Sequence, residues 1–306
     1  MPARSVGRAV ALEAVASDVW RVPVAGEESN PTNGGWVTQP VLVRDGHRLW
    51  LIASGPTPAQ GARLRCAIER TLHLRVTDIV NTRSHPELAL ANVAFSGPRI
   101  WALADVAHAM RERCPQCLLR LQQRIAPAEF STARDDSLRG AKIRVPDHLL
   151  GVKAGGSRDD VAGQLGPFRW WAFERAPGER TLTLVHRDSG WIVAQGLVWA
   201  DGVPNLRETR LDPLMDSLRR LRALARPDSA GILGEQGGPG GIADIDRHLT
   251  YLTQLKRMTQ AALERGEVEG ATAIEVLEFV GTPGYAEYHA LNRQRVWREL
   301  EQAWFK

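Results

Sequence analysis

Residues 76–88 read Val76-Thr-Asp-Ile-Val-Asn-Thr-Arg-Ser-His-Pro-Glu-Leu88, and this stretch decides the expected fold. Its first part, residues 76–80, is a short apolar run that predicts a buried strand. The strand leads directly into a polar loop with Arg83, His85 and Glu87. Histidine and glutamate can bind a metal ion, whereas arginine is a permanent cation without a free lone pair. The loop therefore mixes two competent metal ligands with a residue that cannot be one.

Strand and helix patterns alternate on both sides of this loop. In the first half, apolar runs predict strands at residues 18–24, 36–43, 48–53, 76–80 and 100–103, and helical spacing predicts helices at residues 59–72 and 105–113. In the second half, antiparallel strands are expected at residues 166–175, 182–187 and 191–199, with a hairpin turn at residues 187–190, a helix at 211–224 and a strand at 230–233. Two strand-rich halves, each flanked by helices, predict a layered α/β sandwich.

Helical patterns alone follow residue 242. Helices are expected at residues 242–265 and 285–305, with a short helix at residues 271–279 between them. The apolar stripe of the first helix needs a partner surface; its members are Ile245, Leu249, Leu252 and Leu255. We therefore expect residues 1–241 to form the sandwich and residues 242–306 to form a helical segment packed on the same domain.

The composition limits the classes of function. The 306 residues are 43% hydrophobic, which suits a large buried core, and the formal charge of +4 comes from dispersed arginines without a basic run. We therefore expect no nucleic-acid partner. No apolar run reaches about 18 residues, so no membrane span is expected. Glu13 interrupts the first apolar run too early for a secretory leader. The chain as written predicts a cytoplasmic protein, or a periplasmic one if an export leader has been removed.

Two of the three cysteines form the motif Cys114-Pro-Gln-Cys117. One such pair supplies half of a structural zinc site, and no second pair accompanies it. Either a local disulfide or two free thiols is expected at Cys114 and Cys117. A redox centre is the weaker hypothesis, because no thioredoxin-like βαβ pattern surrounds the pair.

Five segments resemble, in order, those of the metallo-β-lactamase superfamily; they are residues 51–58, 79–88, 175–178, 193–199 and 232–237. The resemblance implies a four-layer αββα sandwich with C-terminal helices. Within the superfamily, the chain is most similar to quinoprotein relay system zinc metallohydrolases. That branch has a C-P-x-C-L-x-x-L segment like residues 114–121, and a C-terminal pattern like His289-x-x-Asn292 followed by residues 297–300.

The positions at which the superfamily holds two zinc ions carry different residues here. A hydrolytic zinc ion needs about three protein ligands and an open position for water. Of the matched residues, only His85 and Glu87 are competent ligands, and Gln236 is a poor third. The resemblance therefore implies a degenerate metal site; its matched positions are Arg83, His85, Glu87, Leu88, Arg175, Gly196 and Gln236. No cofactor is expected, with zinc on His85 and Glu87 as the alternative.

Three interpretations of this site stay open. Arg83 and Arg175 could bind an anion by bidentate contacts, in a pocket that also includes His85, Glu87 and Gln236. Arg83, Glu87 and Arg175 could instead form an internal salt-bridge network, or His85 and Glu87 could belong to a rearranged metal site. We expect a non-catalytic protein that binds a small anion or a partner protein, with a link to a quinoprotein system as part of the resemblance. The alternatives are a metallo-β-lactamase-type hydrolase with an atypical metal site, and a scaffold protein with an inert pocket.

Overall fold

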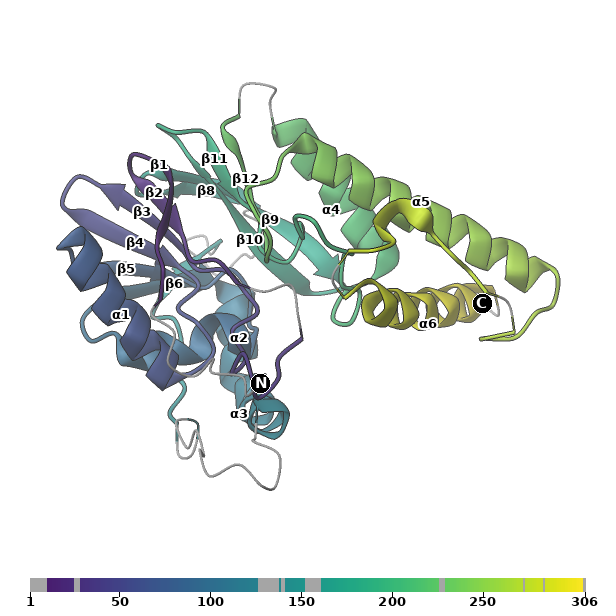
Figure 1. The fold of residues 1–306 in the computed structure, drawn as a ribbon, viewed down its shortest axis with the longest axis horizontal. Coiled ribbons are helices and arrows are strands. Elements are labelled where there is room, and N and C mark those ends of the chain that lie inside the picture. Colours follow the sequence, from purple (N-terminus) through teal and green to yellow (C-terminus); the bar gives the residue numbers. More distant parts are fainter. Residues whose placement is uncertain are drawn as a thin grey trace.

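Two β-sheets lie face to face at the centre of the molecule (Figure 1). The computed structural model describes residues 10–24, 28–125, 138, 141–151, 161–225, 229–271, 273–282 and 284–304. The first sheet holds, in spatial order, β1 (Glu13–Ala16), β2 (Val19–Arg21), β3 (Val41–Asp45), β4 (Arg48–Ile52), β5 (Asp78–Val80), β6 (Arg99–Leu103) and β7 (His148–Leu150). The second holds β12 (Gly231–Leu233), β11 (Trp191–Val193), β10 (Glu179–His186), β9 (Phe168–Ala176) and β8 (Ala162–Leu165).

Helices cover the outer faces of both sheets (Figure 1). The helices of the described residues are α1 (Pro58–Leu72), α2 (Pro86–Ala89), α3 (Ala104–Ile125), α4 (Leu211–Leu224), α5 (Ile242–Glu264) and α6 (Tyr285–Trp304), with 3₁₀ turns η1 (Leu90–Ala94) and η3 (Leu277–Phe279). α1 begins at Thr57, whose hydroxyl accepts a hydrogen bond from the Gln60 amide, and Pro58 suits the first helical turn.

The side-chain alternation of β4 builds the layers. Successive residues of a strand point to opposite faces, so Leu49 and Leu51 pack toward α1. Trp50 and Ile52 enter the core between the sheets, where Trp50 meets Phe168 of β9 edge-to-face at 5.5 Å. A strand buried on both faces explains the continuous apolar run in the sequence. The predicted αββα sandwich is confirmed.

The C-terminal helices share a hydrophobic cluster with the second sheet. Phe173 of β9 lies in the same cluster as Leu252 of α5 and Trp297 of α6. Ile245 and Leu255 are also buried there, and Leu249 packs against it, so the predicted stripe has found its partner surface. The tips of α5 and α6 extend away from the sheets at one end of the molecule (Figure 1). The division at residue 241 stays a prediction.

Several predicted elements have other limits. The strand at residues 36–43 begins only at Val41, and the strand at 191–199 ends at Val193, because the chain turns at Gly196 with φ of +79°. The helix at 105–113 continues through Pro115 to Ile125, since Cys114 and Leu121 extend its buried face. Of the described residues in 271–279, only Leu277–Phe279 form a helical turn.

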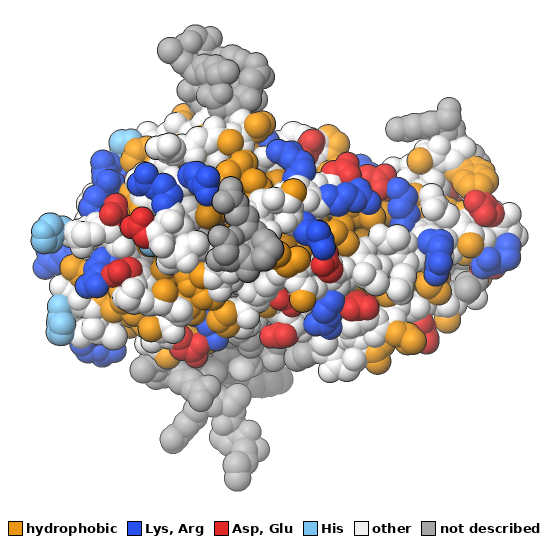
Figure 2. All heavy atoms as spheres, turned by 90° about the horizontal axis from the view of Figure 1, so that it is seen from above, with side chains coloured by type: hydrophobic (Ala, Val, Ile, Leu, Met, Phe, Trp, Pro, Cys, Tyr) orange, Lys and Arg blue, Asp and Glu red, His pale blue; other side chains and the backbone are white. Residues whose placement is uncertain are grey.

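The outer surface is mixed in charge. Basic and acidic side chains are interspersed over the face shown in Figure 2. Among the described residues, no helix is long and apolar enough to cross a bilayer.

Candidate functional site

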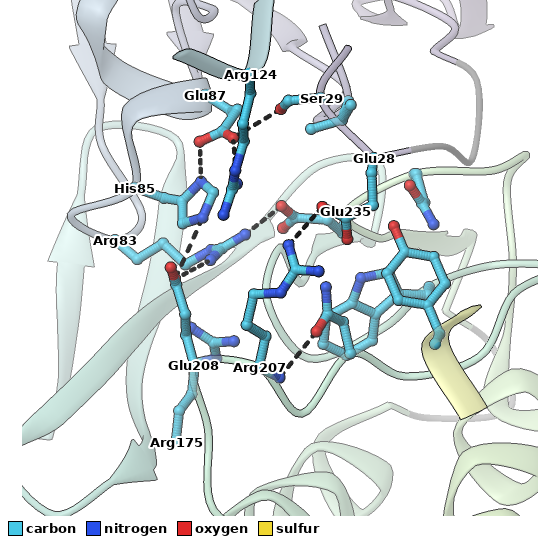
Figure 3. Close-up of a pocket in the computed structure, with 15 residues that line it drawn as sticks. Glu28, Ser29, Arg83, His85, Glu87, Arg124, Arg175, Arg207, Glu208 and Glu235 are labelled. Carbon is cyan, nitrogen blue, oxygen red and sulfur yellow. Dashed lines mark hydrogen bonds and ion pairs between the residues drawn. The ribbon is translucent and has the colours of Figure 1, made fainter. Parts of the chain in front are cut away.

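A cavity of about 50 Å³ lies where the loop after β5 meets the ends of strands from the second sheet (Figure 3). All five residues predicted to bind a ligand line this cavity: Arg83, His85, Glu87, Arg175 and Gln236. Further lining residues come from other loops and helices: Glu28, Ser29, Val37, Arg124, Trp199, Asn205, Arg207, Glu208, Glu235 and Tyr288. The fold therefore brings together side chains that are more than 150 positions apart in sequence, as with Arg83 and Glu235.

The His85 side of the cavity is a chain of ion pairs. His85 precedes the short helix α2, whose first residue is Pro86, and Glu87 is buried in that helix. Nδ1 of His85 lies 2.6 Å from Oε2 of Glu87, and Nε2 lies 3.2 Å from Oε2 of Glu208. Oε1 of Glu87 accepts a hydrogen bond of 2.7 Å from the Ser29 hydroxyl, and Nη1 of Arg124 lies 3.8 Å away.

These carboxylates hold His85 in its charged form. Burial by itself lowers the pKa of His85, but the negative charges of Glu87 and Glu208 outweigh it and raise the pKa to about 10. Burial likewise tends to raise the pKa of Glu87, yet the imidazolium and the Ser29 hydrogen bond bring it below the ordinary value. Opposite charge, chiefly that of His85, also lowers the pKa of Glu208. His85 is therefore an imidazolium at neutral pH.

Arg83 has carboxylate partners on two sides. Nη2 of Arg83 donates to Oε1 of Glu235, and Nη1 lies 3.7 Å from Oε2 of Glu208. The same Glu235 oxygen accepts a hydrogen bond of 2.7 Å from the Thr38 hydroxyl. Glu235 is buried in the segment after β12. Arg83 forms no ion pair with Glu87. The ion pairs therefore differ from the network of Arg83, Glu87 and Arg175 that the sequence suggested.

Arg175 is the exception among these charges. It lies at the end of β9, is only 6% exposed, and its Nε donates a hydrogen bond of 2.9 Å to the Gly196 carbonyl. Among the described residues, its terminal amino groups make no further hydrogen bond or ion pair. Burial first, and the nearby Arg83 cation second, lower the pKa of Arg175 to about 10. The side chain is still charged at neutral pH.

Gly196 explains how two arginines can lie so close together. A Cβ atom added to Gly196 would lie 3.1 Å from Nε of Arg83 and 3.3 Å from Nε of Arg175. Both contacts are tighter than ordinary van der Waals packing, and the φ of +79° also favours glycine. The absent side chain thus leaves the volume that the two arginine side chains fill.

Solved structures with this architecture include metallo-β-lactamases. The chain superposes on the enzyme from Hirschia baltica with a TM-score of 0.59 and 14% identity, over 80% of this chain and 98% of that one. For the enzyme from Erythrobacter litoralis the values are 0.60, 16%, 80% and 97%. For an enzyme from Pseudomonas aeruginosa in its mono-zinc form they are 0.61, 14%, 80% and 95%. No protein-family profile and no curated protein matches the sequence.

This chain has the metallo-β-lactamase fold. Identity of this size shows the fold alone.

The zinc that the metallo-β-lactamase fold implies does not fit the residues present. Both ring nitrogens of His85 lie against carboxylates. The guanidinium groups of Arg83 and Arg175 are cations that offer no lone pair to a metal. Gly196 has no side chain, and Leu88 is buried in the core between the sheets. The described residues contain no group of three or more His, Cys, Asp or Glu side chains placed to hold a metal.

Sequence patterns missed several charged residues of the cavity. Glu208 lies in the loop before α4, and Glu28 forms an ion pair of 2.5 Å with Arg207. No motif or periodicity marks these positions. Glu235 is the partial exception, because it adjoins Gln236 in a segment already assigned to the site.

Cys114 and Cys117 both lie on α3, each as a free thiol. The choice between a local disulfide and two thiols stays a prediction. The thiol of Cys114 lies 3.9 Å from the Ser84 carbonyl oxygen, next to the loop that carries Arg83. A hydrogen bond from Cys114 lowers the pKa of Cys117 to about 7, and the same hydrogen bond raises the pKa of Cys114. The pair lies close to the site but does not line the cavity.

Proposed function

We propose that this protein is a non-catalytic protein of the metallo-β-lactamase fold that binds a small anion in the cavity beside the loop after β5. The observation that carries the proposal is Arg175. A buried guanidinium with one backbone acceptor keeps its terminal donors available, and burying such a charge without an ion partner is unfavourable. A bound anion would supply the missing partner through bidentate hydrogen bonds.

The charge balance of the cavity supports an anionic ligand. Four arginines and the charged His85 line it, against four glutamates: Arg83, Arg124, Arg175 and Arg207, and Glu28, Glu87, Glu208 and Glu235. One positive charge is therefore left over, and Arg175 is the cation without a carboxylate partner among the described residues. Electrostatic attraction is stronger in such a buried site than in water.

The cavity volume supports a small ligand. About 50 Å³ is space for only a few water-sized spheres, since one water needs about 10–15 Å³ by this measure. Acetate, bicarbonate and phosphate are of this size.

Two alternatives from the sequence remain predictions. A hydrolase with metal on His85 and Glu87 would first have to separate the imidazole from its carboxylate partners. A scaffold with an inert pocket would contact a partner protein elsewhere, for example through the helical segment of residues 242–306. A link to a quinoprotein system likewise stays a prediction from the resemblance.

Calorimetric titration with acetate and with phosphate tests the proposal. We expect heat of binding from the wild-type protein and none from Arg175→Met, which keeps an apolar side chain of similar length. Arg219→Met is the matched control, because it removes the same charge from an exposed ion pair on α4. Equal binding by wild type and Arg175→Met would overturn the proposed site. Stoichiometric zinc that is lost on His85→Ala would favour the hydrolase instead.

A further inference from the structure

Glu208 lies where a bound anion would be expected. Its Oε2 atom is 3.2 Å from Nε2 of His85 and 3.7 Å from Nη1 of Arg83. Figure 3 shows the carboxylate pointing at both groups, with the Arg175 side chain beside it. One carboxylate oxygen thus contacts an imidazolium and a guanidinium, which are the donors that a ligand would use.

Glu208 differs from the other acidic residues of the site in its exposure. Its side chain is 48% exposed, whereas that of Glu87 is 2% exposed and that of Glu235 is 7% exposed. Glu208 lies in the loop before α4 rather than in a strand or helix. The Glu208 carboxylate can therefore move into water from a position that is already half exposed. The carboxylates of Glu87 and Glu235 would have to leave buried positions.

Glu208 also lines two neighbouring spaces. A second cavity of about 40 Å³ lies next to the first, and four residues line both: Arg83, His85, Arg175 and Glu208. Of these four, Glu208 has the most exposed side chain. A move of its carboxylate into water would therefore enlarge the space beside Arg83, His85 and Arg175.

We propose that the carboxylate of Glu208 occupies the ligand subsite as an internal competitor, and that the ligand is a small carboxylate which binds by displacing it. This inference rests on the proposed anion site. When a ligand carboxylate replaces that of Glu208, His85 and Arg83 each keep an anionic partner. The ligand also comes within reach of Arg175. Because Glu208 is tethered beside the subsite, its effective concentration there is high and it weakens the apparent affinity.

Titration of two Glu208 variants with acetate and glutarate tests the competitor. Glu208→Gln removes the charge, and Glu208→Asp keeps it but shortens the reach to His85. We expect both variants to bind the carboxylates about tenfold more tightly than wild type. This gain is expected if the Glu208 carboxylate occupies the subsite about nine-tenths of the time in the wild-type protein. The matched control is Glu13→Gln. The Glu13 side chain is 49% exposed, much like that of Glu208, and it forms an ion pair of 2.5 Å with Arg21. The affinity of this control should equal that of wild type.

The outcomes separate this inference from the proposed function. Unchanged affinity in both Glu208 variants, with binding still lost in Arg175→Met, overturns the competitor and leaves the anion site in place. A gain in Glu208→Gln but not in Glu208→Asp means that charge acts at a distance, which also overturns it. A gain for phosphate but not for the carboxylates overturns the ligand class. Absence of binding in every variant overturns both proposals.

Discussion

The two ends of β5 carry two charge clusters that are built differently. At the start of the strand, the Asp78 carboxylate is fully buried. It accepts hydrogen bonds from Nη2 of Arg48 at 2.8 Å, from Nε1 of Trp101 at 2.9 Å and from the Thr77 hydroxyl at 2.8 Å, and Nε of Arg99 lies 3.0 Å away. Burial tends to raise the pKa of Asp78, but the Trp101 and Arg48 hydrogen bonds and the other donors bring it below its ordinary value.

The cluster beyond the other end of β5 is incomplete. Arg83 and His85 have carboxylate partners, one of which is the half-exposed Glu208, and Arg175 has none among the described residues. In the Asp78 cluster, the one buried carboxylate has enough hydrogen-bond donors, so no unpaired charged group remains for a ligand to bind. The Arg83 cluster holds a surplus cation beside a cavity. A satisfied group of charges stabilises a fold, whereas an unsatisfied one beside a cavity indicates a binding site.

The largest expected effect is the loss of Asp78. Asp78→Ala should lower the free energy of unfolding by about 3 kcal/mol, because its buried donors lose their acceptor. Urea denaturation measures the change. Asp216→Ala, in an exposed ion pair with Arg219, should cost no more than about 0.5 kcal/mol. A similar cost for the two variants would contradict the contrast between the clusters.

Arg83→Met should lower the free energy of unfolding by about 2 kcal/mol, because it leaves the Glu235 carboxylate buried without its cation. The double variant Arg83→Met/Glu235→Gln should recover part of the loss in the same urea experiment. If the double variant is no more stable than Arg83→Met alone, the unpaired charge is not the cause.

His85 should make stability depend on pH in a known direction. Its pKa is raised in the folded state, from 6.5 to about 10, so its stabilisation is complete below pH 6.5 and is lost as the pH rises toward 10. The lowered pKa of Glu87 acts in the other direction, giving stabilisation above its ordinary value of 4.5 that is lost on acidification. The cluster should therefore stabilise the fold most between these two ordinary values.

Urea denaturation of wild type and His85→Gln from pH 6 to pH 10 measures this dependence. The difference in stability should shrink with rising pH, by at most about 1.4 kcal/mol per pH unit for one proton. A difference that stays constant would show that His85 is neutral in the folded protein.

The smallest expected effect has the opposite sign. Arg175→Met should raise the free energy of unfolding by about 1 kcal/mol, because it removes a buried charge that lacks an ion partner. The same variant should lose anion binding, which would make Arg175 a residue kept for function at a cost in stability. Thermal unfolding without added anions measures the gain. A loss comparable to that of Arg83→Met would show that Arg175 is paired after all.

Much of the fold could be predicted from the sequence. The continuous apolar runs at β4 and β5 and the helical stripe of α5 are local patterns, and the structure confirms them. The predicted ends of some helices and strands were wrong where tertiary contacts prevail over the local sequence pattern. β11 ends at Val193 and the chain turns at Gly196, where an added Cβ atom would crowd Arg83 and Arg175. The helix through Pro115 continues because its buried face continues.

Hydrophobic period and side-chain chemistry are local properties, so the amino-acid sequence was enough to predict the sandwich and the residue types in the loop after β5. The resemblance to the metallo-β-lactamase superfamily also placed Arg83, His85, Glu87, Arg175 and Gln236 in one candidate site, and all five line one cavity. Only the tertiary structure decided which charges meet. Ion pairing depends on distances between distant segments, so no local pattern could assign Glu235 to Arg83 or Glu208 to His85. For the same reason, only the structure identified Arg175 as the cation of this cavity that has no carboxylate partner among the described residues.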